Sequence, residues 1–156
     1  MQLSETAINV IFLVAIVLLL AFSFYIRIRR MKRSALGRVA TILGDLNKNQ
    51  KLVDDFSYHH AVKGFRTRAW KKNKDTIEFI PENVRIKLAK VFEMSDEVND
   101  RIKSAKRVKS DSYMAGIDLS RLKTPLAEAR QQLREWVQEN MQNPEYLPKR
   151  RRGLFR

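Results

Sequence analysis

The sequence predicts an all-α protein with a single N-terminal transmembrane helix, followed by a small cytoplasmic helical bundle or an extended helical hairpin. Three observations support this prediction. Residues 7–26 (AINVIFLVAIVLLLAFSFYI) contain no charged side chain. Several later segments repeat apolar residues at three- and four-residue spacing, which is typical of amphipathic helices. Only residues 76–80 (TIEFI) resemble a strand, and one strand cannot form a sheet.

The apolar run has the length of one membrane crossing. Twenty helical residues rise about 30 Å, which is the thickness of a hydrocarbon core. Aromatic side chains favour the headgroup level, and three of them lie at the C-terminal end of the run, namely Phe22, Phe24 and Tyr25. We expect residues 7–26 to be the transmembrane helix.

The charges beside the run predict its orientation. Residues 1–6 contain only one charged side chain, Glu5, whereas five basic residues follow the run, namely Arg27, Arg29, Arg30, Lys32 and Arg33. Basic residues are concentrated on the cytoplasmic side of membrane proteins. We therefore expect residues 1–6 to form a short extracytoplasmic tail and the rest of the chain to be cytoplasmic. The layout resembles that of single-span bacterial anchors with helical cytoplasmic domains, which implies the inner membrane.

A cleaved signal peptide is the alternative to a permanent anchor. Ala21 and Ser23 have the small-x-small spacing that a signal peptidase recognises. However, no Lys or Arg precedes the run, the run is long for a signal peptide, and five basic residues follow the cut. These features favour an uncleaved anchor. The absence of cysteine agrees with a reducing compartment.

Residues 27–56 are predicted to form a basic juxtamembrane segment and a helix. Apolar residues follow at helical spacing, namely Leu36, Val39, Leu43 and Leu46. No proline separates them from the span, so the two helices could form a single rod that ends between residues 47 and 54. Gly37 and Gly44 share one face of that rod, where they are either tolerated or allow the close approach of another helix.

Residues 57–142 are predicted to form a helical cytoplasmic domain. A helix over residues 57–72 would begin near the acidic pair Asp54 and Asp55 or at Ser57, and residues 76–80 would be extended. The clearest soluble helix spans residues 81–107. It carries one apolar seam that is interrupted by a polar residue, Ser95, and contains Val84, Leu88, Val91, Val98, Ile102 and Ala105.

A loop with a possible helical turn near residues 118–122 is expected to precede the last helix. Thr124 has the side chain of an N-cap, and Pro125 suits the first helical position. This helix would continue to Met141 and end at Asn143 and Pro144, before an irregular basic tail over residues 143–156.

The predicted seams are narrow and of the coiled-coil kind, so each helix must pack on another helix. A bundle within the chain would satisfy this requirement. Alternatively, other chains could complete the seams, either as copies in a homo-oligomer or as subunits of a larger membrane complex.

The net charge of +14 comes from three blocks that contain no acidic residue. Residues 27–33, 63–74 and 149–156 contain five, six and five basic residues, and the remaining 15 basic residues are balanced by 17 acidic ones. The positive-inside bias explains the first block. The third block (KRRRGLFR) could bind a membrane surface or remain a solvated tail.

The second block combines cations with Phe65 and Trp70, a composition with four interpretations. The cations could be the solvated side of a short helix, or they could bind an acidic protein, lipid headgroups or single-stranded nucleic acid. A straight helix would carry Lys63 about 55 Å from the span, so lipid contact requires the chain to fold back. The predicted partner-binding residues are Leu36, Val39, Leu43, Leu46, Arg66, Arg68, Trp70, Lys71, Lys72, Arg150, Arg151 and Arg152.

We expect no catalytic site, cofactor site or metal site. His59 and His60 are the only histidines, and neighbouring residues of a helix point about 100° apart. No phosphate-binding loop, nucleophile elbow or H-E-x-x-H motif is present. The sequence therefore favours a non-enzymatic accessory subunit, scaffold or tether that contacts membrane lipid and other proteins. A membrane-anchored nucleic-acid-binding protein is the alternative, and a small enzyme or phage-type lytic protein is a third class.

Overall fold

A computed structural model of the chain describes residues 5–59 and 62–148, and every regular element within these ranges is a helix. The elements are α1 (Glu5–Arg33), α2 (Ala35–Asp54), α3 (Arg68–Asn73), the 3-10 turn η1 (Lys74–Thr76), α4 (Glu82–Val108), α5 (Asp111–Ala115) and α6 (Ser120–Asn140). The predicted fold class is confirmed, since a long apolar first helix is followed by a helical domain.

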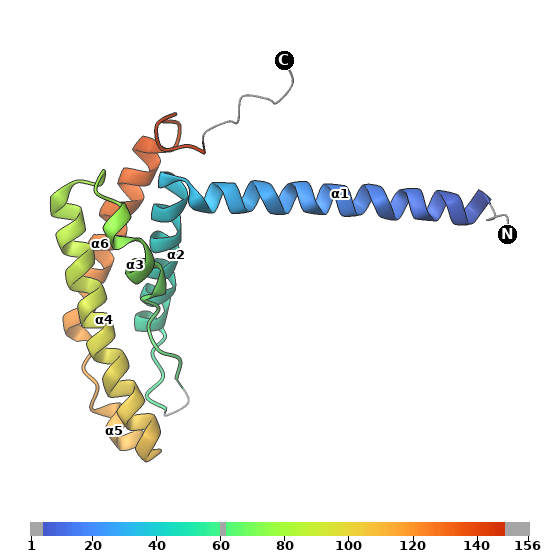
Figure 1. Ribbon diagram of the computed structural model, residues 1–156. Coiled ribbons are helices and arrows are strands. Elements are labelled where there is room, and N and C mark those ends of the chain that lie inside the picture. Colours follow the sequence, from blue (N-terminus) through green and yellow to red (C-terminus); the bar gives the residue numbers. More distant parts are fainter. Residues whose placement is uncertain (1–4, 60–61, 149–156) are drawn as a thin grey trace.

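Helices α2, α4 and α6 form the body of the domain (Figure 1). The chain returns to the start of α2 before α4 begins, so α2 and α4 run in the same direction and α6 runs against both. Helix α6 packs on α2 and on α4, whereas α3 packs on α2. The bundle is therefore the correct one of the two predicted architectures.

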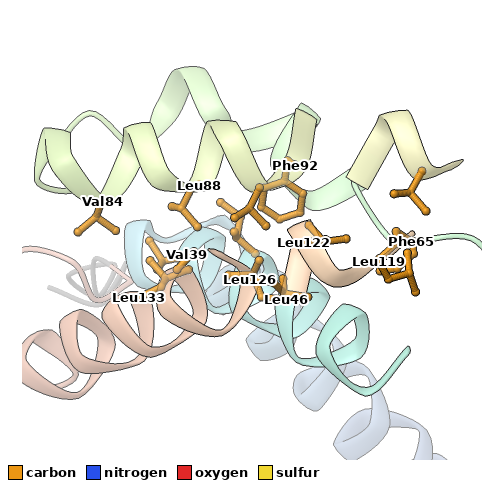
Figure 2. Packing of buried hydrophobic residues seen from close by; sticks show 14 of the residues in the cluster. Val39, Leu46, Phe65, Val84, Leu88, Phe92, Leu119, Leu122, Leu126 and Leu133 are labelled. Carbon is orange, nitrogen blue, oxygen red and sulfur yellow. The ribbon is translucent and has the colours of Figure 1, made fainter. Parts of the chain in front are cut away.

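The seams meet inside the chain. Figure 2 shows Val39 and Leu46 of α2 facing Leu126 and Leu133 of α6, with α4 side chains such as Leu88 covering them. Leu36, Val39 and Leu46 are buried in this core, and Leu43 is partly buried against it. The sequence left open whether other chains complete these seams, and the structure shows that α4 and α6 complete them.

The expected single rod is wrong, because the helix breaks at Ser34. The backbone of Ser34 is extended, with φ −69° and ψ 161°, and its hydroxyl accepts the N–H of Gly37 at 3.0 Å as an N-cap. The same hydroxyl donates to the carbonyl of Met31 at 2.7 Å. Helix α1 consequently leaves the bundle crosswise to α2 instead of extending it (Figure 1).

The predicted helix over residues 57–72 is also wrong. In the described part of this segment the chain has no regular structure until α3 begins at Arg68. Asp54 is the last residue of α2 and Asp55 is its C-cap, so neither of them starts a helix. Residues 76–80 form turns instead of an extended piece, although Ile77 and Ile80 are buried in the core.

The prediction for α4 is confirmed within one residue at each end. Its seam residues are buried, and so is Ser95, whose hydroxyl donates to the carbonyl of Val91 at 2.8 Å. A polar residue therefore fits this seam, because the preceding turn of the same helix accepts its hydrogen bond.

The predicted start of the last helix is wrong by several residues. Helix α6 begins at Ser120, and Pro125 lies inside it. Leu119 and Leu122 are buried in the core, so packing stabilises the first turn although Pro125 donates no N–H to it.

The described part of the C-terminal segment is packed. The ring centroid of Tyr146 lies 5.2 Å from that of Phe79 and 5.4 Å from that of Trp136. The Tyr146 carbonyl also accepts the N–H of Leu36 at 3.1 Å. The segment that follows α6 is therefore held beside the start of α2 by a hydrogen bond and by ring packing.

Candidate functional site

Helix α1 exposes its apolar surface over most of its length. Its large apolar side chains from Val10 to Phe24 are each 50–69% exposed. Residues Val10–Arg33 form a helix that is long and apolar enough to cross a membrane, and none of its most apolar stretch is buried by the rest of the chain. The predicted interface residues lie in the second half of this helix. All of them are exposed, namely Phe22, Phe24, Tyr25, Arg27, Arg29, Arg30, Lys32 and Arg33.

Two of the three basic blocks meet at the corner between α1 and α2. We call the hollow there the cationic groove, and its volume is about 1090 Å³. Seven basic side chains and one carboxylate, that of Asp45, are among its lining residues; the basic ones are Lys32, Arg33, Arg38, Arg66, Arg68, Lys71 and Lys72. The first block supplies two of these cations and the second block supplies four. The fold-back that lipid contact requires is therefore present.

Two asparagines hold the second block in place. The Asn49 side chain of α2 accepts the N–H of Arg66 at 2.7 Å and donates to its carbonyl at 2.8 Å. The Asn99 side chain of α4 does the same for Phe65, at 2.6 and 2.9 Å. An amide side chain offers both an acceptor and a donor, so it can pair with the N–H and the C=O of one backbone residue. We call this pair the asparagine clamp.

Most of the groove cations have no ion-pair partner in the described residues. Lys71 is the exception, since its ammonium nitrogen lies 2.8 Å from an Asp96 carboxylate oxygen. Asp45 is already engaged, because its carboxylate accepts the N–H of Ala69 at 3.0 Å. The buried Nε of Arg38 has no hydrogen-bond partner within the described part of the chain. The groove therefore has more donors and positive charge than its own acceptors satisfy.

An apolar hollow adjoins the groove between α1 and α2. We call it the notch; its volume is about 440 Å³, and its lining residues are Phe24, Arg27, Ile28, Met31, Lys32, Gly37, Ala40 and Thr41. It shares Lys32 and Thr41 with the cationic groove. A Cβ added to Gly37 would clash with the Met31 backbone, so this glycine permits the close corner between the helices.

A third hollow places the C-terminal segment beside α1. It is lined by Ser23, Ile26, Arg27, Arg30 and Met31 of α1 and by Pro144, Leu147 and Pro148. The third basic block begins directly after Pro148. The predicted partner residues Arg150, Arg151 and Arg152 lie outside the described residues.

The other predicted partner residues lie in different environments. Arg66, Arg68, Lys71 and Lys72 are exposed and line the groove. Leu36, Val39 and Leu46 are core residues, so their contacts are made within this chain and they offer no surface to a partner. The Trp70 ring stacks on Phe92, with centroids 5.3 Å apart and planes at 5°. That stacking covers one face of the ring, which disfavours its use as a platform for nucleic-acid bases.

Within residues 5–59 and 62–148, no group of three or more His, Cys, Asp or Glu side chains could hold a metal ion. His59 lies near Asp111, with Nε2 and a carboxylate oxygen 3.8 Å apart. His60 lies outside the described residues.

Sequence reasoning missed the asparagine clamp and the notch. Both clamp residues occur in helices, and their positions resemble ordinary polar positions in the sequence. One signal was available for Asn49, which follows Leu46 at the same helical spacing as the buried residues before it. It is 1% exposed.

Comparisons with protein-family models, curated proteins and solved structures found no match for this chain. Its function is therefore inferred from the exposed apolar helix, the groove and the notch.

Proposed function

We propose that this chain is a non-enzymatic, single-pass membrane tether that holds a helical domain on the cytoplasmic face of the inner membrane. Helix α1 would cross the bilayer with residues 1–6 outside. The domain would serve other proteins as an accessory subunit or scaffold. The observation that carries the proposal is the convergence of cations at the end of α1, where the cytoplasmic headgroups of an anionic leaflet would lie.

The completed core supports a domain that acts as a rigid unit. The apolar seams are used internally, so partners must contact the polar surface of the bundle. On α4, an exposed row at helical spacing lies opposite the buried seam and contains Ile86, Lys90, Glu93, Glu97 and Asp100. This row is mostly acidic, unlike the groove, and Figure 1 shows α4 on the side of the bundle away from α1. The domain thus has a cationic side for the membrane and an acidic row for a protein partner.

Single-cysteine variants can test the proposal, because the chain contains no cysteine of its own. Glu97→Cys places one thiol in the acidic row of α4, and Arg68→Cys places one in the groove. With a short thiol-reactive photocrosslinker in native membranes, we expect Glu97→Cys to trap one protein in stoichiometric yield. That protein would be either a partner or a second copy of this chain. Arg68→Cys should not trap it.

The same approach tests the orientation. A membrane-impermeant maleimide should label Glu5→Cys in intact cells and should label Glu97→Cys only after the membrane is opened. Labelling in the reverse order, or release of the chain by alkaline carbonate, would overturn the proposed anchoring. Recovery of Glu97→Cys only as an uncrosslinked monomer would overturn the tether function.

A further inference from the structure

We infer that the cationic groove and the notch form one binding site for an anionic phospholipid. The lipid phosphate would lie among the groove cations, and one acyl chain would lie in the notch. This inference rests on the membrane-spanning role proposed above for α1, and it adds a ligand class to that proposal.

The height of the groove fits a lipid headgroup. Lys32 and Arg33 follow Ile26, the end of the uncharged run, by six and seven residues. On a helix this separation is about 10 Å, which lies within the headgroup layer beside the hydrocarbon core. The groove therefore opens where phosphates are concentrated.

The donors of the groove fit a phosphate. Arg38, Arg66 and Arg68 are guanidinium groups without ion pairs in the described residues, and Arg38 has a buried Nε without an acceptor. Guanidinium groups bind phosphate oxygens through pairs of parallel hydrogen bonds. The Asn49 amide of the clamp fixes the backbone of Arg66, two residues before Arg68, so the backbone that carries these groups is ordered before the ligand binds.

The notch distinguishes a phospholipid from other anions. Its wall is formed by Phe24, Ile28, Met31 and Ala40 beside the groove, and Phe24 belongs to the uncharged run. An acyl chain leaving the groove could enter the notch and continue along α1 into the hydrocarbon. A nucleic acid, an acidic peptide or a free phosphate has no comparable apolar chain, so these ligands would leave the notch unfilled.

Native mass spectrometry of the full chain in mild detergent provides the test. The protein would be titrated with dioleoyl phosphatidylglycerol or with dioleoyl phosphatidylcholine. The two lipids have the same acyl chains, and the headgroup is net negative in the first and zwitterionic in the second. We expect one phosphatidylglycerol to bind at an about tenfold lower concentration than phosphatidylcholine. Both phosphates can accept hydrogen bonds from the groove, but phosphatidylglycerol has a net negative charge, whereas the choline cation of phosphatidylcholine is repelled by the groove cations.

Two pairs of matched variants localise the binding. Arg38→Gln with Arg68→Gln should remove the preference for phosphatidylglycerol, whereas Lys90→Gln with Arg107→Gln makes the same change in net charge on α4 and should leave the preference unchanged. Ala40→Trp should fill the notch and weaken phosphatidylglycerol binding about tenfold, whereas Ala89→Trp on the exposed surface of α4 should not weaken it.

Several results would overturn the inference. Equal binding of the two lipids would show that the groove does not select a negatively charged headgroup. Equal losses in the groove and α4 variants would show that binding reflects the net charge of the protein alone. Full displacement of the lipid by millimolar inorganic phosphate, with no effect of Ala40→Trp, would assign the site to free phosphate. A single-stranded oligonucleotide could displace the lipid and also bind less tightly to the groove variant. That result would assign the site to nucleic acid. These measurements need neither a partner nor an oriented bilayer, so their outcome is separate from that of the crosslinking and labelling experiments.

Discussion

The conformation of residues 62–67 depends on two single side chains. Phe65 and Arg66 lie in a described segment without regular structure, and the side-chain amides of Asn99 and Asn49 pair with their backbone N–H and C=O groups. A backbone group that loses its partner inside a protein keeps its desolvation penalty without compensation. The clamp therefore contributes to stability out of proportion to its size, and it also positions the groove.

The contribution of the asparagine clamp to stability should be measurable as a change in the free energy of unfolding. We expect Asn49→Ala and Asn99→Ala each to lower that free energy by about 2 kcal/mol, because each leaves one backbone donor and one acceptor unpaired. Urea unfolding of the purified chain in micelles, followed by circular dichroism, would measure the change. Asn47→Ala is the matched control, since Asn47 is exposed on the same helix. A clamp variant as stable as this control would contradict the role given to the clamp.

Asp118 gives the fold a pH-dependent contact at the start of α6. The pKa of the Asp118 carboxyl lies below its ordinary value of 3.8. The main cause is a hydrogen bond from the Ser120 hydroxyl, and the second is one from the Ser120 N–H at 2.8 Å. A carboxyl group with a lowered pKa in the folded state stabilises the fold above its unfolded pKa. That contribution is lost as the pH falls through the folded pKa.

In an NMR titration of the folded chain, we therefore expect the chemical shift of the Asp118 carboxyl carbon to change with a midpoint below pH 3.8. Asp118→Ala should be less stable than the natural chain at pH 6, and the difference should shrink in acid once Asp118 is protonated. A midpoint at or above the ordinary value would show that the Ser120 hydrogen bonds do not persist in solution.

At the scale of elements, the start of α6 shows tertiary packing prevailing over a local signal. Thr124 and Pro125 have the residue types of an N-cap and a first helical position. The helix nevertheless begins at Ser120, because Leu122 must reach the core beside Leu126. Pro125 then lies where its ring and missing N–H weaken the first turns.

Substitutions at these two positions distinguish the alternatives. We expect Pro125→Ala to raise the free energy of unfolding by about 1 kcal/mol or more, because it restores a helical hydrogen bond to the carbonyl of Arg121. Thr124→Ala should be neutral, whereas loss of a true N-cap would lower stability by about 1 kcal/mol. Thermal unfolding of both variants in micelles would decide, and destabilisation by both would favour a helix that starts at Thr124.

The elements that could be predicted are those with information in their own sequence. The seam of α4 repeats over about six turns, and the ends of the helix are predicted within one residue. Residues 57–72 carried too little local information, because their conformation depends on Asn49 and Asn99, which lie on two other helices. Ser34 resembled an ordinary residue inside a helix, although its hydroxyl can cap a new one.

The candidate site shows the same division between local and long-range information. The cations of the first two blocks were recognisable as unusual in the sequence, and so was the need for the chain to fold back before the second block could contact lipid. Their meeting place depends on the reversal between Asp54 and Arg68 and on the corner at Ser34. The notch depends on the same corner, so it could not be predicted from residues 7–26 or residues 35–54 taken separately.

At the scale of the whole molecule, the corner at Ser34 determines how the domain meets a membrane. Helix α1 leaves crosswise to the axis of the bundle (Figure 1). With α1 across the bilayer, α2 would lie along the membrane surface instead of standing on it. Ala40, Asn47 and Lys51 form an exposed row on one face of α2, and Ala40 also lines the notch beside α1. This row should therefore face the headgroups along its whole length.

Spin labels on single cysteines can test this orientation in vesicles that contain anionic lipid. We expect labels at Ala40→Cys, Asn47→Cys and Lys51→Cys to collide equally with a nickel chelate attached to lipid headgroups. A label at Glu97→Cys, on the far side of the bundle, should collide less, since one layer of packed helices adds about 8–10 Å. If the bundle stood upright instead, Lys51 would lie about 16 Å farther from the membrane than Ala40, because eleven residues separate them along the helix. Collision would then fall steadily from Ala40 to Lys51, and the cations of the groove would not share the headgroup layer that the lipid site requires.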